Sequence, residues 1–263
     1  MSRDRPSSEE LARLLAVDWL PRSSHFDPWW VIENLMGPNA LWLTEYLAQG
    51  MDLRAGMRVL DMGCGRALSS IFLAKEFGVE VWATDLWVQP GENAERIAVA
   101  GLEYQVFPIH AEAHALPFAP DFFDAAVSID AFHYFGTDDL YLGYFARFIK
   151  PGGQIGIAVP GVTREIGADI PPHLSLYWEW DFCSFHSPEW WRIHWVKTGM
   201  VDVSSADWMP DGWKLWLKWL EVCEEVGGRS SPDEAAMLRA DAGRYLGFAR
   251  VVGQRRERPK YGK

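Results

Sequence analysis

The chain has 263 residues, 49% of them hydrophobic and 23% charged, which is ordinary for a folded globular protein and excludes a disordered tail or a collagen-like repeat. Its 36 acidic and 25 basic side chains give a formal charge of −11, so the surface repels nucleic-acid backbones and anionic lipid headgroups at long range. The three cysteines are far apart and no run of about 18 apolar residues occurs, so we expect a cytoplasmic protein with no membrane insertion and no nucleic-acid partner.

Residues 1–56 are predicted to form a helical cap ahead of the first strand. The serine pair of SSEELARLL offers a capping hydroxyl, and the two glutamates that follow lie in the first turn. Across residues 25–50, two apolar stretches at helical spacing are separated by Gly37 and Pro38, which interrupt helices. We therefore expect two further helices, one on each side of this break.

Residues 57–160 alternate between strand and helix patterns. Strands are predicted in MRVLDMG, VEVWATD, YQVFPIHAEA, DFFDAAVSIDAFHYF and PGGQIGIAVPG, and helices in ALSSIFLAKEFG, NAERIAVAG and DLYLGYFARFI. This alternation with short connections predicts a right-handed parallel sheet covered by helices on both faces. Such sheets bind ligands at the carboxyl ends of their strands.

The alternation stops after Gly161. Residues 161–190 form a segment rich in proline and tryptophan, which we predict to be a lid insertion. Residues 191–253 are predicted to complete the sheet, with one or two helices inserted before a last strand. Residues 254–263 are strongly basic and are predicted to be a solvated tail.

A glycine loop follows the first predicted strand, in the text VLDMGCGRA. Gly63 and Gly65 allow a sharp turn and let a ligand lie against bare backbone, while the next helix presents free N–H groups. Asp85 ends the second strand, and its carboxylate suits the two hydroxyls of a ribose. A loop that only makes a tight turn is the alternative interpretation.

The ligand of this loop is predicted to lack phosphate. A dinucleotide site needs a third glycine where the chain has Leu68, and Asp61 would repel a pyrophosphate, so a nicotinamide dehydrogenase is disfavoured. A cationic ligand suits Asp61 better. S-adenosylmethionine fits this description, because it carries an ammonium, a sulfonium, a ribose and an adenine.

These motifs together resemble the class I S-adenosylmethionine-dependent methyltransferases, in particular the small-molecule group that includes the type 11 and cyclopropane-fatty-acid-synthase-like enzymes. The resemblance rests on VLDMGCG, ATDLW, HAEAHALPF, FDAAVSIDAFHYF and IKPGG, over roughly residues 57–160. It implies a Rossmann-like α/β fold, with a seven-stranded sheet whose last strand is antiparallel, helices on both faces, and a lid of helix and loop. The chain departs from the family at Ala67, where a third glycine is frequent.

The resemblance also implies a set of residues that contact the cofactor and its product, S-adenosylhomocysteine. The glycine loop would hold the methionine and ribose, and the acid that ends the second strand would bind the ribose hydroxyls. The segment before LPF would contact the adenine. The end of the fourth strand would lie against the cofactor near its methyl group. In this order the residues are Asp61, Gly63, Cys64 and Gly65, then Asp85 and Leu86, then Glu112 and Ala113, and finally Ile129 and Asp130.

The end of the fourth strand also carries the candidate catalytic residues. Methyl transfer from a sulfonium is an in-line displacement, which needs alignment of donor and acceptor, and a base only when the acceptor must lose a proton. His133 is the candidate base and Tyr134 the candidate hydrogen-bond donor, while a packing role for His133 stays open. His110 and His114 lack a third ligand nearby, so no metal site is predicted.

Fifteen tryptophans are unusual for this length. In the family that the chain resembles, the amino-terminal helices and the lid typically cover the acceptor, so aromatic and histidine side chains there are candidate substrate contacts, with lid packing as the alternative. These candidates are His25, Trp29, Trp30, Trp178 and His186. Trp213, Trp216 and Trp219 keep close to one helix face, and we predict that they pack in the core.

The predicted function is methyl transfer from S-adenosylmethionine to a nitrogen, oxygen or sulfur atom of a small, apolar or amine-containing metabolite. Two alternatives stay open. One is a lipid or phospho-base methyltransferase of the cyclopropane-synthase type, although Phe132 and Tyr134 replace the acid that usually neighbours the histidine in that group. The other is a module that binds S-adenosylmethionine without transferring its methyl group.

Overall fold

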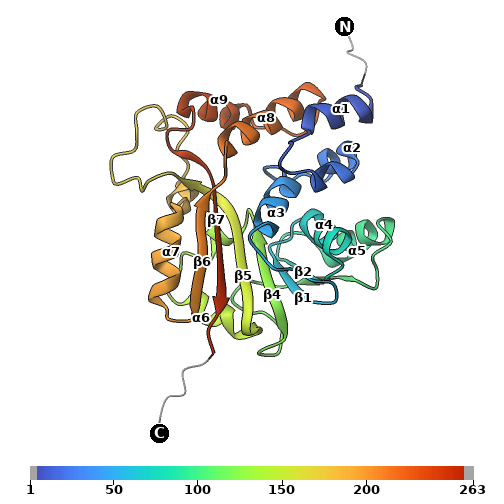
Figure 1. Ribbon diagram of the computed structural model, residues 1–263. Coiled ribbons are helices and arrows are strands. Elements are labelled where there is room, and N and C mark those ends of the chain that lie inside the picture. The colour runs from blue at the N-terminus through green and yellow to red at the C-terminus, as the bar shows by residue number, and fades with distance from the viewer. Residues whose placement is uncertain (1–4, 258–263) are drawn as a thin grey trace.

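A seven-stranded sheet with the order β3-β2-β1-β4-β5-β7-β6 organises the protein, as a computed structural model describing residues 5–257 shows (Figure 1). Neighbouring strands are parallel from β3 to β5, and β7 is antiparallel to both β5 and β6. The strands are β1 Arg58–Met62, β2 Glu80–Asp85, β3 Val106–His110, β4 Phe123–Ile129, β5 Ile149–Val162, β6 Val201–Trp208 and β7 Leu246–Arg255. The predicted sheet, including its antiparallel last strand, is confirmed.

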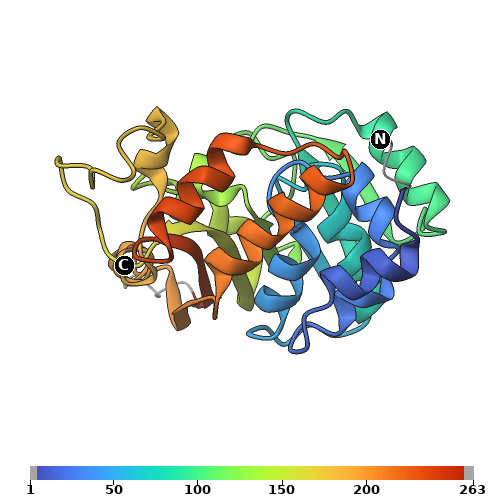
Figure 2. The ribbon, with the colours of Figure 1, turned by 90° about the horizontal axis from the view of Figure 1, so that it is seen from above.

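Helices cover both faces of the sheet and one of its ends (Figures 1 and 2). The α-helices are α1 Ser8–Leu15, α2 Pro28–Glu33, α3 Ala40–Ala48, α4 Leu68–Phe77, α5 Pro90–Val99, α6 Tyr141–Phe145, α7 Pro188–Lys197, α8 Gly212–Glu225 and α9 Pro232–Asp241. Figure 1 shows α7 on one side of the sheet, α4 and α5 on the other, and α1, α8 and α9 across the top. Among residues 5–257, no helix is both long enough and apolar enough to cross a membrane.

Side chains of the central strands alternate between two buried cores. In β1, Val59 belongs to the core that includes residues of α3, α4 and α8, while Leu60 and Met62 belong to the core that includes residues of α6 and α7. Successive residues of a strand point to opposite faces, so a strand covered on both faces must be apolar throughout. Asp61 is the exception among the four buried residues of β1, and it lies near the strand's carboxyl end, next to the glycine loop.

The amino-terminal cap forms largely as the sequence predicts. Ser7 caps α1 through a capping box with Glu10, because each residue's side chain bonds the other's backbone N–H. Gly37 and Pro38 separate α2 from α3, and the Asn39 side chain caps α3 by accepting from two backbone N–H groups. The break between the two helices is therefore confirmed.

The predicted tail from residue 254 begins too early, because Gln254 and Arg255 are the last residues of β7. The Arg255 side chain is buried, and its guanidinium donates to the Ile149 carbonyl and to Asp121. Both partners bind the Nη1 atom and hold the basic residue in the sheet, whereas its Nε atom has no partner among residues 5–257. The rest of the predicted tail reaches residues 258–263, which lie outside the described residues.

The predicted lid segment also has different bounds. Its first two residues, 161–162, finish β5, and its last three, 188–190, begin α7. Between them the chain is irregular except for one short 3-10 helix, η4 (Trp180–Ser184). Proline at the first position of α7 and the Ser187 side-chain cap explain why that helix begins before residue 191.

Candidate functional site

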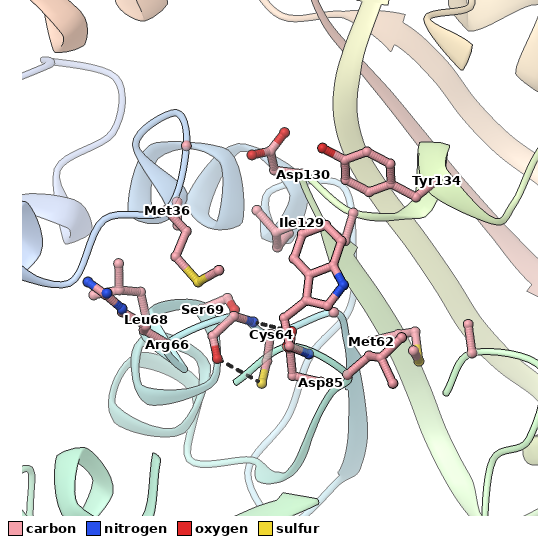
Figure 3. A pocket seen from close by; sticks show the side chains of 18 of the residues that line it. Met36, Met62, Cys64, Arg66, Leu68, Ser69, Asp85, Ile129, Asp130 and Tyr134 are labelled. Carbon is pink, nitrogen blue, oxygen red and sulfur yellow. Dashed lines mark hydrogen bonds between the residues drawn. The ribbon is translucent and has the colours of Figure 1, made fainter. Parts of the chain in front are cut away.

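A cavity of about 320 Å³ lies at the carboxyl ends of the parallel strands (Figure 3). Its wall is formed by the loops after β1, β2, β3 and β4 and by the segment between α2 and α3. β1 and β4 are adjacent, and the chain crosses from β3 to β4 past β2 and β1 at this point. Such a switch point, where adjacent loops diverge, is the usual ligand site of open α/β sheets.

The glycine loop forms the floor of this cavity. Gly63 and Gly65 have φ angles of +75° and +53°, in the region that favours glycine. A Cβ atom on Gly63 would lie 2.4 Å from the Ala131 Cβ, and one on Gly65 would lie 2.8 Å from the Met36 Sδ. Ala67, the departure from the family pattern, also has a positive φ of +60° and directly precedes α4. The loop therefore keeps its turn without the third glycine.

Asp85 fastens the loop after β1 to the end of β2. Its Oδ2 atom accepts from the Gly65 N–H at 2.8 Å, and its Oδ1 atom accepts from the N–H groups of Trp87 and Val88 at 2.7 and 2.8 Å. A carboxylate offers about four lone-pair positions. Asp85 lines the cavity with one position left, so it shapes the loop and still presents an acceptor to a ligand.

Asp61 lies beneath the loop, fully buried, and does not line the cavity. Its Oδ2 atom accepts from the hydroxyls of Ser69 and Ser70, both at 2.6 Å, whereas its Oδ1 atom has no partner among residues 5–257. Burial raises the pKa of this carboxyl to about 6, against the opposing effect of the two serine hydrogen bonds. The unpartnered oxygen is thus a buried acceptor next to the ligand site.

Glu112 and Ala113, the predicted adenine contacts, line the cavity after β3. Glu112 accepts from the His114 N–H at 2.8 Å and pairs with the His114 ring, whose hydrogen bond holds the pKa of Glu112 below its usual value. The His110 ring instead contacts the Leu86 carbonyl at 2.9 Å. The two histidines thus serve different partners, and no group of three metal-ligating side chains occurs in the described part of the chain.

Ile129, Asp130 and Tyr134 form the wall at the end of β4 (Figure 3). Asp130 has a φ of +52°, and its carboxylate lies close to Gly37, where an added Cβ would be 2.5 Å from Oδ2. Burial, with a contribution from the charge of Glu234, raises the pKa of Asp130 to about 8. This end of the cavity therefore holds a carboxyl that changes charge near neutral pH.

The prediction that His133 faces this region is wrong. The side chain is 2% exposed and does not line the cavity; it packs between the rings of Tyr134 and Phe185. Consecutive residues of the 3-10 turn Phe132–Tyr134 project in different directions, and it is Tyr134 that reaches the cavity. Burial lowers the pKa of His133 to about 3, so this ring stays neutral.

The five candidate substrate residues also lie away from the cavity wall. His25 pairs with Glu76, and His186 pairs with Glu165 while stacking on the Trp190 ring. The other three have aromatic or cationic neighbours: Trp29 lies under Arg5, Trp30 stacks on Phe26, and Trp178 contacts Phe182 edge to face. Of the predicted core tryptophans, Trp216 and Trp219 are confirmed as buried.

Several cavity residues were not predicted. They come from the segment between α2 and α3 and from positions beside the known motifs: Met36, Gly37, Pro38, Arg66, Leu68, Ser69 and Trp87. The Gly-Pro pair was visible in the sequence, but only as a helix break. Such a break between helices can also indicate a ligand site, because a segment that crosses over a glycine loop places backbone and small side chains against the ligand.

Comparisons with known proteins find methyltransferases. Residues 59–153 match the family model described as "Methyltransferase domain". The methyltransferase GfsG of Streptomyces halstedii is 34% identical over 132 residues, which cover 49% of this chain and 48% of the relative. The 27-O-demethylrifamycin SV methyltransferase of Amycolatopsis mediterranei is 25% identical over 222 residues, covering 79% of this chain and 77% of the relative.

A solved structure shares the fold more completely. Phosphoethanolamine N-methyltransferase 2 of Haemonchus contortus, solved with S-adenosyl-L-methionine, superposes with a TM-score of 0.68 at 19% identity, over 94% of this chain and 60% of that one. In the match to GfsG, the chain spans about half the length of that relative. The chain is therefore similar to methyltransferases in residues 59–153 and in its relatives, and it shares the fold of a structure solved with S-adenosyl-L-methionine.

Proposed function

We propose that the protein transfers a methyl group from S-adenosylmethionine to a small metabolite. The observation that carries this proposal is the joining of three separate motifs in one cavity: the glycine loop after β1, Asp85 after β2 and Glu112 after β3. Separate motifs that converge on one ligand-sized space are stronger support than any one motif alone. The methyltransferase relatives support the same reaction class.

The residues present fit the cofactor. The bare backbone of Gly63 and Gly65 leaves room where a Cβ would collide, and the buried Asp61 Oδ1 atom lacks a partner, which suits an ammonium nearby. Asp85 would hold the ribose hydroxyls and Glu112 the adenine amine. When bound, the cofactor supplies an electrophilic methyl group on a sulfonium.

The chain's own contribution is alignment and exclusion of water. The loop after β1 is fixed by Asp85, and the rings of Trp87 and Tyr134 meet edge to face, 5.7 Å apart, from loops that follow β2 and β4. Holding donor and acceptor in line supplies much of the acceleration of such a displacement. We also infer a cytoplasmic protein, because Cys64, Cys183 and Cys223 are free thiols, and a small-molecule rather than nucleic-acid partner, because of the charge of −11.

Calorimetric titration with S-adenosylmethionine and S-adenosylhomocysteine tests the proposal. We expect both to bind, and we expect S-adenosylhomocysteine to form when the protein is incubated with labelled cofactor and a panel of small amines, alcohols and thiols. Absence of cofactor binding would refute the proposal. Binding without product from any acceptor would favour the alternative of a binding module.

The buried Asp61 predicts a pH dependence of cofactor binding. Its pKa of about 6 means that the group is mostly neutral at pH 5 and mostly ionised at pH 7. If the cofactor's ammonium binds the ionised form, affinity rises with pH by roughly tenfold over this interval. Calorimetry at the two pH values checks the rise, and Asp61→Asn should remove it; an equal rise in that variant would assign the pH dependence to another group.

The same group affects the stability of the free protein. Because its folded pKa lies above the unfolded value near 4, the folded state binds more protons between about pH 4 and pH 6. The contribution of Asp61 to stability is therefore fully present below pH 4 and is lost as the pH rises to 6. Urea titrations of the wild type and Asp61→Asn, without cofactor, should differ in this window.

A further inference from the structure

Three carboxylates from separate elements act by their charge on the Tyr134 side chain at the β4 end of the cavity, and one of them, Asp130, lines the cavity beside it. Asp130 follows β4, Asp181 lies in η4, and Glu234 lies in the first turn of α9. Burial first, and then the charges of these three groups, raises the pKa of the Tyr134 hydroxyl to about 12. Figure 3 shows the Tyr134 hydroxyl pointing toward the Asp130 carboxylate.

These carboxylates are poorly satisfied by the protein itself. Within residues 5–257, the Asp130 carboxylate has no hydrogen-bond or ion-pair partner although it lines the cavity, and the buried Asp181 Oδ1 atom has none either. The Glu234 carboxylate accepts a hydrogen bond from the Trp216 indole N–H, which is a neutral donor. The Glu234 backbone N–H donates to the Ser231 hydroxyl, which is also neutral. Buried carboxylates without a cationic partner are costly, so the arrangement favours a ligand that brings positive charge.

We infer that the methyl acceptor carries a primary or secondary ammonium group, which binds between Asp130 and Tyr134 under the additional influence of the Glu234 charge, and that Asp130 removes its proton before N-methylation. This inference rests on the proposed function, since it specifies the acceptor at the same site. Of the nitrogen, oxygen and sulfur acceptors that the sequence analysis left open, the inference selects nitrogen.

The proton and electron pair balance in this scheme. The Asp130 carboxylate takes one proton from the ammonium, which leaves a neutral amine with a free lone pair and a neutral carboxyl. The lone pair forms the new nitrogen–carbon bond to the methyl group as the carbon–sulfur bond breaks, and the products are a methylated ammonium and a neutral thioether. Asp130 suits the first step because its pKa of about 8 lies closer to that of an amine than an ordinary carboxyl does.

The same charges disfavour the other acceptor classes. A carboxylate or phosphate placed beside Asp130 and Glu234 would meet like charges, with no lysine or arginine among the cavity residues at the β4 end. A neutral alcohol would leave the carboxylates without a counter-charge. The site therefore distinguishes acceptors by charge before it distinguishes them by shape.

Matched probes test the inference by binding, apart from turnover. We would saturate the protein with S-adenosylhomocysteine and titrate benzylamine against benzyl alcohol and benzoate, and ethanolamine against ethylene glycol. We expect each amine to bind at least about tenfold more tightly than its matched alcohol, and benzoate not to bind. If neither amine exceeds its alcohol, the inference is wrong, whereas failure of S-adenosylhomocysteine itself to bind would count against the proposed function.

Two variants locate the effect. Asp130→Asn keeps a side chain that tolerates the positive φ of this position, and Glu234→Gln keeps an oxygen for the Trp216 indole. Both should lose the preference for amines over alcohols when each variant is measured at a concentration of S-adenosylhomocysteine that saturates it. Glu103→Gln, an exposed carboxylate between α5 and β3, removes the same charge far from the cavity and should keep the preference. An unchanged preference in both site variants would overturn the assignment.

Discussion

Asp85→Ala is expected to weaken S-adenosylhomocysteine binding by about 100-fold and to lower the free energy of unfolding by about 3 kcal/mol. The binding loss follows from removal of the acceptor proposed for the ribose hydroxyls. The stability loss follows because the Gly65, Trp87 and Val88 N–H groups all lose their carboxylate acceptor. Calorimetric titration measures the first effect, and urea unfolding without ligand measures the second.

Two comparisons separate these effects. Asp85→Asn retains one carbonyl oxygen for the backbone, so it should recover part of the stability but little of the binding. Glu103→Ala, on the exposed connection before β3, should change neither quantity. Wild-type affinity in Asp85→Ala would refute the ribose assignment, even if the variant were less stable.

Gly63→Ala should be the most damaging single-methyl change in the glycine loop. The added Cβ would lie 2.4 Å from the Ala131 Cβ, and the residue would have to keep a φ of +75°. We expect a loss of unfolding free energy of about 3 kcal/mol or a displaced loop, because contacts this short force the backbone to move. Cofactor affinity should fall with it, since Ala131 also lines the cavity.

Gly101→Ala is the matched control for the backbone alone. Gly101 has a similar φ of +71°, but an added Cβ there has no atom within 4 Å. Its expected cost is about 1 kcal/mol, the penalty for alanine in the left-handed region, with cofactor binding unchanged. Equal losses of stability in the two variants, measured by urea unfolding, would show that the collision with Ala131 is relieved without cost.

The cofactor half of the site was predictable because its signals are local. Gly63, Gly65 and Asp85 stand at strand ends, and the parallel sheet brings strand ends together whatever the rest of the chain does. Contacts between residues that are far apart in the sequence leave no such local pattern. Met36 reaches Gly65 from the amino-terminal cap, and Glu234 reaches the β4 end from α9.

The aromatic residues show a second limit of sequence reasoning. A tryptophan that lines a site and a tryptophan that packs in a core contribute equally to the amino-acid composition. Only the packing in the folded protein distinguishes them. Trp191, which directly follows the predicted lid segment, is fully buried against the ring of Phe132. His133 failed for a related reason, since position along the chain does not fix which way a residue of a short turn points.

The position of β7 between β5 and β6 constrains the order in which the chain acquires its structure. β6 is complete at residue 208, but its neighbour in the sheet ends only at residue 255. During synthesis β6 therefore has no partner until the last strand has left the ribosome, whereas all cavity residues lie between positions 34 and 135. The early half, with its adjacent parallel strands, can assemble first, and the edge of β5 stays open to wrong pairing until β7 arrives.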